Sequence, residues 1–147
     1  MATPPRLNAI LYVEDDSELR TLVNMLLVNL EKFSVRACAS GAEALQEVKT
    51  FTPDLLLLDV AMPGMDGTET LIALRERAAT LSTPVIFLTS NALDHEVAYY
   101  STLGAIGVIA KPFDPAQLGE EIRRIWHNHE WPAMQAQQDG PPAGNAP

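Results

Sequence analysis

The sequence predicts an α/β protein with a doubly wound sheet of five parallel strands, in the order 2-1-3-4-5, and five helices covering both faces. Short apolar runs alternate with segments of helical spacing, and no two strand-like runs are joined by a hairpin signal. This alternation indicates parallel strands joined by crossover helices. Residues 55–59 are apolar almost throughout, which is typical of a strand buried on both faces.

The elements follow in order along the chain. Strands are expected where short apolar or β-branched runs occur, at residues 8–13, 33–38, 55–59, 85–88 and 107–110. Helices are expected where apolar residues recur at helical spacing, at residues 17–31, 42–49, 67–79, 95–103 and 115–126. Four of these helices have a candidate N-cap, namely Asp16 or Ser17, Ser40, Asp94 and Asp114. Pro115 then occupies a first helical position, which proline favours.

Composition and segment patterns indicate which partners, location and domain division to expect. The net charge of −9 argues against a nucleic-acid partner, because phosphate binding needs a surface rich in Lys and Arg. Neither a signal peptide nor a run of transmembrane length is recognised, so we expect a cytoplasmic protein without membrane insertion. We expect residues 1–7 to be a flexible leader and residues 8–127 to form one domain. Residues 128–147 are rich in Pro, Gln, Gly and Ala and are expected to be a disordered tail.

Polar side chains gather where the predicted strands end. They are Glu14, Asp15 and Asp16 after the first strand, Asp59 at the end of the third, Thr89 and Ser90 after the fourth, and Lys111 after the fifth. The carboxyl ends of parallel strands lie at one edge of the sheet, and ligands bind there where the strand order reverses. In the predicted order the first and third strands are neighbours, so the acidic triplet and Asp59 should lie close together.

This acidic group predicts a site for a divalent cation. Clustered carboxylates repel one another and raise one another's pKa, and a bound cation removes that conflict. An all-oxygen site open to water suits Mg²⁺, or alternatively Mn²⁺. For Asp16 we favour the simpler role of a helix cap. For Asp15 and Asp59, taken with Thr89 and Lys111, we favour a functional site, because the contributing strand ends agree.

Four segments together resemble the receiver domain of two-component response regulators, the CheY-like family, in its stand-alone form. The segments are Val13-Glu14-Asp15-Asp16, Leu55 to Gly67, Thr89-Ser90 and Lys111-Pro112-Phe113. They occur in the family's order and spacing, from about residue 8 to about residue 126. The resemblance implies a flavodoxin-like fold and a phosphorylated signalling switch rather than an enzyme.

The resemblance also implies a role for each acidic residue. Asp59 would be the phosphoacceptor, whose carboxylate attacks the phosphohistidine of a sensor histidine kinase or histidine phosphotransfer protein and becomes an aspartyl phosphate. Asp15, Asp59 and the backbone carbonyl of Ala61 would bind Mg²⁺ directly, with Glu14 acting through water. The metal would neutralise charge as the phosphoryl group transfers.

Further implications concern how a signal leaves the site. Lys111 would pair with one phosphoryl oxygen, and the Thr89 hydroxyl would donate to another, drawing the loop after the fourth strand inward. The peptide bond before Pro112 is expected to be cis. In the family, an aromatic residue on the fifth strand often moves inward with this change. Val108 stands at that position here, which removes the aromatic group from this part of the coupling.

Several side chains outside the site also have an expected environment. Cys38 has apolar neighbours and is expected to be a buried, reduced thiol. On the fourth helix, Tyr100 is expected in the core. Tyr99 and His95 are four residues apart and therefore share a face, which we expect to be exposed and to contact a partner.

We therefore expect a response regulator that receives a phosphoryl group on Asp59 and signals through protein contacts, as a monomer or weak dimer. The kinase and the downstream target are not identified by the sequence. Two close alternatives are a phosphorelay intermediate and a phosphate sink. A phosphatase of the haloacid-dehalogenase type is less favoured, since Asp59-Val60-Ala61 lacks the second acid of that class. A flavodoxin-like cofactor binder is also disfavoured, because Glu14-Asp15-Asp16 would repel a phosphate group.

Overall fold

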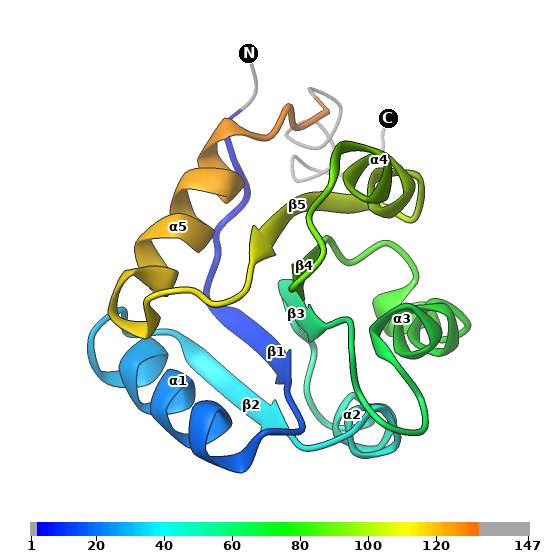
Figure 1. The fold of residues 1–147 in the computed structure, drawn as a ribbon, viewed down its shortest axis with the longest axis horizontal. Helices are drawn as coiled ribbons and strands as arrows, with labels where there is room; N and C mark the ends of the chain where they lie inside the picture. Colours follow the sequence, from blue (N-terminus) through cyan, green and yellow to red (C-terminus); the bar gives the residue numbers. More distant parts are fainter. Residues whose placement is uncertain (1–2, 133–147) are drawn as a thin grey trace, which may run out of the picture.

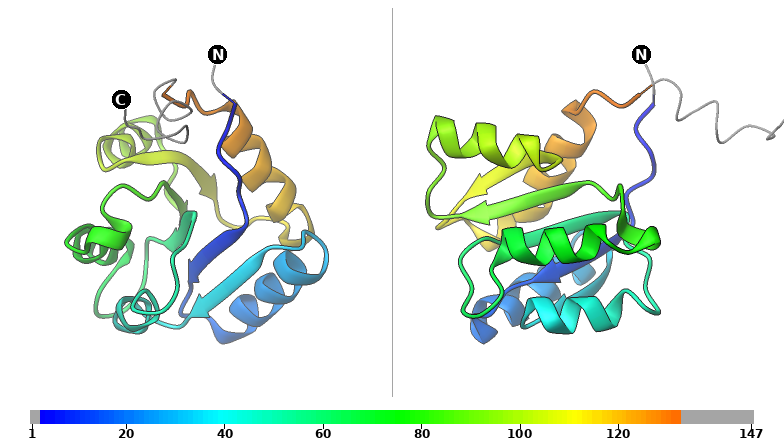
Figure 2. Two further views of the ribbon diagram at one scale, coloured as in Figure 1. Left: turned by 180° about the vertical axis from the view of Figure 1, so that it is seen from behind. Right: turned by 90° about the vertical axis from the view of Figure 1, so that its right-hand side faces the viewer.

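A single five-stranded parallel sheet runs through the molecule (Figures 1 and 2). The computed structural model describes residues 3–132 of the 147. The strands are β1 (Ala9–Val13), β2 (Ser34–Cys38), β3 (Leu55–Asp59), β4 (Val85–Thr89) and β5 (Ala105–Ala110). Their order in the sheet is β2-β1-β3-β4-β5. The predicted fold class and strand order are confirmed.

Helices cover both faces of this sheet (Figure 1). One face carries α1 (Ser17–Asn29) and α5 (Pro115–Asn128). The other carries α2 (Gly41–Glu47), α3 (Gly67–Arg75) and α4 (Asp94–Thr102), and the short 3-10 helix η1 (Ala78–Thr80) follows α3. Because both faces are covered, every residue of β3 and β4 is buried. This burial accounts for the continuous apolar runs in the sequence.

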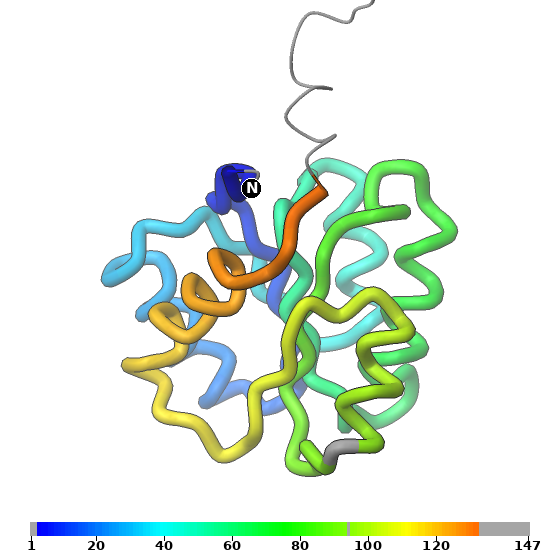
Figure 3. The backbone as a smooth tube through the Cα atoms, turned by 90° about the horizontal axis from the view of Figure 1, so that it is seen from above, coloured from blue at the N-terminus to red at the C-terminus, as the bar shows by residue number. Residues whose placement is uncertain are grey.

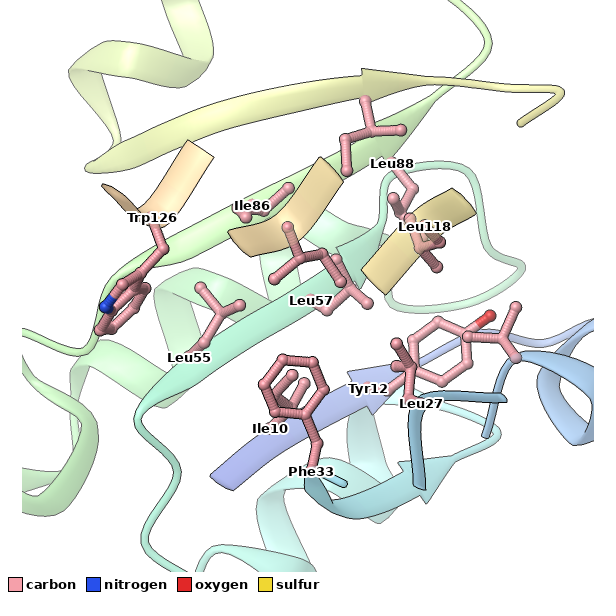
Figure 4. Close-up of a cluster of buried hydrophobic side chains, with 13 residues drawn as sticks. Ile10, Tyr12, Leu27, Phe33, Leu55, Leu57, Ile86, Leu88, Leu118 and Trp126 are labelled. Carbon is pink, nitrogen blue, oxygen red and sulfur yellow. The ribbon is translucent and has the colours of Figure 1, made fainter. Parts of the chain in front are cut away.

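Each layer of helices closes its own hydrophobic core. The core beneath α1 and α5 is built from large side chains (Figure 4), including Ile10, Tyr12, Leu27, Phe33, Leu55, Leu57, Ile86, Leu88, Leu118 and Trp126. The core beneath α2, α3 and α4 contains Cys38, Phe87 and Tyr100. The predicted burial of Cys38 and Tyr100 is confirmed, and burial raises the pKa of the Cys38 thiol to about 12.

Side chains at the loops determine where most helices begin. Asp16, Ser40 and Asp114 each accept a hydrogen bond from a backbone N–H of the first helical turn, as predicted. The start of α3 was not predicted in this detail. Asp66 is its N-cap and forms a reciprocal capping box with Glu69.

Helix α4 begins without such a cap. The prediction of Asp94 as N-cap is wrong, because Leu93 occupies that position and Asp94 is the first helical residue. The aliphatic side chain of Leu93 cannot accept a hydrogen bond, so the first backbone N–H groups of α4 have no capping side chain to which they can donate. The helix ends before Gly104, whose φ of +95° suits glycine.

The first and the last residues that the structure describes lie on the same side of the molecule (Figure 3). The indole N–H of Trp126 donates to the carbonyl of Pro5 at 2.8 Å, and that of Trp131 donates to the carbonyl of Trp126 at 2.8 Å. The expected division into a leader (1–7), a domain (8–127) and a disordered tail (128–147) remains a prediction, and residues 133–147 lie outside the described residues. Between residues 3 and 132, no helix combines the length and apolarity needed to cross a membrane.

Candidate functional site

The strand order brings the predicted polar residues to one edge of the sheet. Val13 of β1 pairs in register with Leu58 of β3, so Glu14 follows β1 beside Asp59, the last residue of β3. On the other side of β3, β4 ends in Thr89, which pairs with Ala110 of β5. Lys111 follows β5 directly. Residues far apart in the sequence therefore meet at this edge.

Three carboxylates form the centre of this edge. Glu14, Asp15 and Asp59 each have an oxygen within 4.8 Å of an oxygen of the other two. Glu14 and Asp59 are buried, at 1% and 2% exposure, whereas Asp15 is exposed. Burial, and then the charge of Asp59, raises the pKa of Glu14 to about 7. Burial also raises the pKa of Asp59, although the ammonium of Lys111 opposes it.

Lys111 is shared between the two buried acids. Its Nζ lies 3.3 Å from Oε1 of Glu14 and 3.3 Å from Oδ1 of Asp59. Burial alone would lower the pKa of Lys111, but the two carboxylates outweigh it and the pKa is raised. Lys111 is therefore a fixed positive charge beside Asp59. The peptide bond before Pro112 is cis, as expected.

One oxygen in this group lacks a hydrogen-bond partner. Oδ1 of Asp59 is buried and close to Lys111, yet the contact lacks hydrogen-bond geometry and no other described residue supplies a donor. An unpaired buried carboxylate oxygen costs free energy unless a cation or donor reaches it. The donor set of three carboxylates consists of oxygen alone, which is the set that Mg²⁺ and Mn²⁺ prefer. The residues present therefore fit a divalent cation.

Hydrogen bonds that involve backbone groups hold the loop after β1 beneath this cluster. The N–H of Glu14 donates to the carbonyl of Cys38 at 3.0 Å, which ties the end of β1 to β2. Oε2 of Glu14 accepts from the N–H of Asp16 at 3.2 Å, and Asp16 itself caps α1 as expected. Arg20, which the sequence reasoning missed, donates from Nη1 to the carbonyl of Glu14 at 2.8 Å. The only sign of this contact in the sequence is that Arg20 lies about one helical turn after the acidic triplet.

Gly67 is a second residue that the sequence reasoning missed. A Cβ at this position would lie 2.3 Å from the carbonyl oxygen of Asp59 and 2.8 Å from Cα of Val60. The Gly67 N–H also donates to the carbonyl of Val60 at 2.9 Å. The loop after Asp59 thus folds back tightly onto the end of β3, because residue 67 has no side chain. The expected role of the Ala61 carbonyl as a metal ligand remains a prediction.

The hydroxyl of Thr89 is held by its own loop. It accepts from the N–H of Asn91 at 3.0 Å and lies 3.5 Å from the carbonyl of Asn91, to which it can donate. Thr89 is only 4% exposed. Next to Lys111, an apolar hollow of about 330 Å³ opens at the surface, lined by Leu19, Ser90, Lys111, Pro112 and Phe113.

Known proteins are similar to this chain in sequence and in fold. Residues 10–123 match the family described as response regulator receiver domain. The transcriptional regulatory protein CpxR of Escherichia coli K12 is 39% identical over 133 residues, which cover 90% of this chain and 55% of CpxR. The alkaline phosphatase synthesis transcriptional regulatory protein PhoP of Bacillus subtilis is 32% identical over 126 residues, 84% of this chain and 51% of PhoP. The chain thus spans about half the length of these curated relatives.

Solved structures agree with the sequence comparison. The chemotaxis response regulator CheY4 of Vibrio cholerae has a TM-score of 0.73 at 29% identity, over 82% of this chain and 99% of CheY4. The BeF3-activated DrrB receiver domain has a TM-score of 0.65 at 27% identity, over 82% of this chain and 97% of that domain. Since the matched residues 10–123 include every strand-end residue from Glu14 to Lys111, this chain belongs to the response regulator receiver domain family, whose members are phosphorylated signalling switches rather than enzymes.

Proposed function

We propose that Asp59 accepts a phosphoryl group from the phosphohistidine of a sensor histidine kinase or a histidine phosphotransfer protein. The observation that carries this proposal is the buried Oδ1 of Asp59, which has no hydrogen-bond partner among the described residues. This oxygen lies 3.3 Å from the ammonium of Lys111. The same ammonium could pair with a phosphoryl oxygen bound to Asp59. This unpaired oxygen supports a role for Asp59 in chemistry at the sheet edge rather than in holding the fold together.

In the proposed reaction, an oxygen of Asp59 forms a bond to phosphorus while the bond from phosphorus to the histidine nitrogen breaks. The imidazole leaves with the electron pair of that bond. Glu14, Asp15, Asp59 and the carbonyl of Ala61 would hold Mg²⁺, and the metal when bound neutralises charge on the phosphoryl oxygens. The ammonium of Lys111 opposes the effect of burial on the pKa of Asp59, and after transfer it would pair with a phosphoryl oxygen.

The phosphoryl group would then act on the loop after β4. Phosphorylation adds roughly −1.5 to −2 charges and three acceptor oxygens at the sheet edge. The Thr89 hydroxyl, which now bonds to Asn91, would donate to one of these oxygens. The N–H of Asn91 would lose its acceptor, and the loop that leads into α4 would be released from its present conformation. We propose that output passes from there through contacts with other proteins.

A phosphotransfer assay tests this proposal. The wild type should become labelled from a phosphohistidine donor only when Mg²⁺ is present, and Asp59→Asn should remain unlabelled. Asp114→Asn is a matched control, because it makes the same change at the α5 cap, where Asn caps as well as Asp. Full labelling of Asp59→Asn, or labelling that persists in EDTA, would contradict the assignment.

The lifetime of the phosphoryl group separates the remaining roles. A phosphorelay intermediate should pass its label on to a second histidine protein, whereas a phosphate sink should lose it to water. An output regulator should instead bind a target protein more tightly when labelled. The net charge of −9 favours protein partners over nucleic acid for this chain. A cytoplasmic site of action and a monomer or weak dimer are part of the same proposal.

A further inference from the structure

Arg20 donates hydrogen bonds to three consecutive carbonyl groups in the loop after β1. Its Nη1 lies 2.8 Å from the carbonyl oxygen of Glu14 and 3.5 Å from that of Asp15. Its backbone N–H donates to the carbonyl of Asp16 at 2.9 Å. Side chains of an α-helix lean toward the N-terminal end of the helix, so Arg20, near the start of α1, can reach back over this loop. A single residue therefore holds the carbonyls of all three acidic residues.

Asp15 depends on its backbone for its place in the carboxylate cluster. Glu14 and Asp59 are buried, and both lie beside the ammonium of Lys111. Asp15 is exposed, and its carboxylate forms no hydrogen bond or ion pair with any residue between 3 and 132. The direction of its side chain is therefore set by the two peptide groups that flank it. Those peptide groups carry the Glu14 and Asp15 carbonyls to which Arg20 donates.

The guanidinium of Arg20 contacts carbonyl groups rather than a carboxylate. Among the described residues, no acidic side chain forms an ion pair with it. Its positive charge lies close to the acidic cluster, and such a charge by itself repels a divalent cation. Loss of the charge alone should therefore strengthen Mg²⁺ binding, whereas loss of the hydrogen bonds to the loop should weaken it. The two possible roles of Arg20 thus predict changes of opposite sign.

We propose that Arg20 is a positioning residue for the metal site, and that its hydrogen bonds to the loop after β1 set the affinity for Mg²⁺. Arg20 acts through the backbone, which keeps an oxygen of Asp15 within 4.8 Å of oxygens of Glu14 and Asp59 before a metal arrives. This inference rests on the proposed Mg²⁺ site, but it concerns a residue that does not itself bind the metal. Removal of a group that orients a metal ligand typically lowers metal affinity by about 10- to 100-fold.

Calorimetric titration of the full chain with Mg²⁺ measures this role without any phosphotransfer. Arg20→Gln should bind Mg²⁺ at least about tenfold more weakly than the wild type. Arg20→Lys keeps the charge but has one donor nitrogen in place of the planar fork, so its affinity should lie between those of the wild type and Arg20→Gln. Arg124→Gln is the matched control. It makes the same substitution on an exposed side chain of α5 that pairs with Glu121, and it should bind Mg²⁺ as the wild type does.

A double-mutant cycle separates positioning from a general loss of stability. If Arg20 acts through Asp15, Arg20→Gln should change Mg²⁺ affinity by less than about threefold in a chain that already carries Asp15→Asn. A general weakening of the fold would instead lower the affinity by the same factor in both backgrounds. Urea unfolding in buffer with EDTA shows which variants are folded under the conditions of the titration.

The outcomes of these titrations differ clearly. Mg²⁺ binding by Arg20→Gln that equals or exceeds that of the wild type would overturn the positioning role, as would equal losses in the two backgrounds. If Arg20→Gln does not fold, Arg20→Lys provides the same test, because an affinity equal to or tighter than that of the wild type would overturn the role. A wild type that bound no Mg²⁺ would overturn the proposed metal site, and this role with it.

Discussion

Glu14 makes the stability of the folded protein depend on pH in an unusual direction. Burial, and then the charge of Asp59, raises its pKa from 4.5 to about 7 in the folded protein. In the unfolded chain the carboxyl returns to its ordinary pKa. Between pH 4.5 and about 7 the folded protein therefore binds more protons at this residue than the unfolded chain does. Stability falls wherever the folded state binds more protons and the pH rises, so ionised Glu14 opposes folding above neutral pH.

The structure gives the size of this effect. The difference between a pKa of 4.5 and one of about 7 corresponds to a loss of about 3 kcal/mol of unfolding free energy above pH 7. Glu14→Gln removes the ionisation, while its amide oxygen can still accept from the N–H of Asp16 and Lys111 keeps Asp59 as a partner. We therefore expect the variant to be more stable than the wild type by about 2–3 kcal/mol at pH 8 and to lose that advantage at pH 4.5.

Urea unfolding at pH 4.5, 6 and 8, in buffer with EDTA, measures this prediction. The quantity to compare is the difference in unfolding free energy between the variant and the wild type, because the other titrating groups contribute to both. Asp15→Asn is the control, since it removes a neighbouring charge that water already solvates and should have a smaller effect. If the unfolding free energies of the wild type and Glu14→Gln changed in parallel with pH, the pKa of Glu14 would not be raised in the folded protein.

Three further predictions concern the metal, the loop after β3 and α4. Mg²⁺ should stabilise the wild type more at pH 8 than at pH 5.5, because carboxylates must lose protons to bind it. At a Mg²⁺ concentration of 100 times Kd, the unfolding free energy should rise by about 2.7 kcal/mol. Equal shifts of the melting temperature at both pH values would argue against a carboxylate site. Gly67→Ala should lower the unfolding free energy by about 1–3 kcal/mol, since the added Cβ would lie 2.3 Å from the carbonyl oxygen of Asp59. The same variant should bind Mg²⁺ more weakly in a titration. His95→Ala and Tyr99→Ala should change unfolding free energy by less than about 0.5 kcal/mol but lower the affinity for a partner; unchanged affinity for every partner tested would remove α4 from the interface.

Short-range signals predicted most of the fold. Apolar runs of strand length placed the strands to within a few residues, because a strand buried on both faces must be apolar along its whole length. Caps at Asp16, Ser40 and Asp114 were predicted because a cap acts within one helical turn. Asp66 and Glu69 have the spacing of a capping box, and that signal was available but overlooked. Asp94 failed as a cap because its helix begins one residue earlier than the spacing indicated.

The acidic centre of the site was also accessible from the sequence. Glu14, Asp15 and Asp59 follow or end adjacent parallel strands, so the fold class alone brings them together. The sharing of Lys111 between Glu14 and Asp59 could not be predicted in the same way. Lys111 and Glu14 are 97 residues apart, and whether Nζ reaches one acid or both depends on side-chain positions within the fold. The same holds for Arg20, whose guanidinium turns back to the carbonyl of Glu14.

The sequence alone thus led to the sheet, to its order and to a carboxylate cluster around Asp59, because periodicity and strand ends are local properties of the chain. Tertiary packing alone decided how that cluster is connected to the rest of the molecule. Val108 leaves β5 without an aromatic ring, and only the structure shows that Tyr100 of α4 lies on Phe87, the residue in register with it. Which side chain covers Phe87 depends on which surfaces meet, and a sequence pattern does not record where a neighbouring helix will lie.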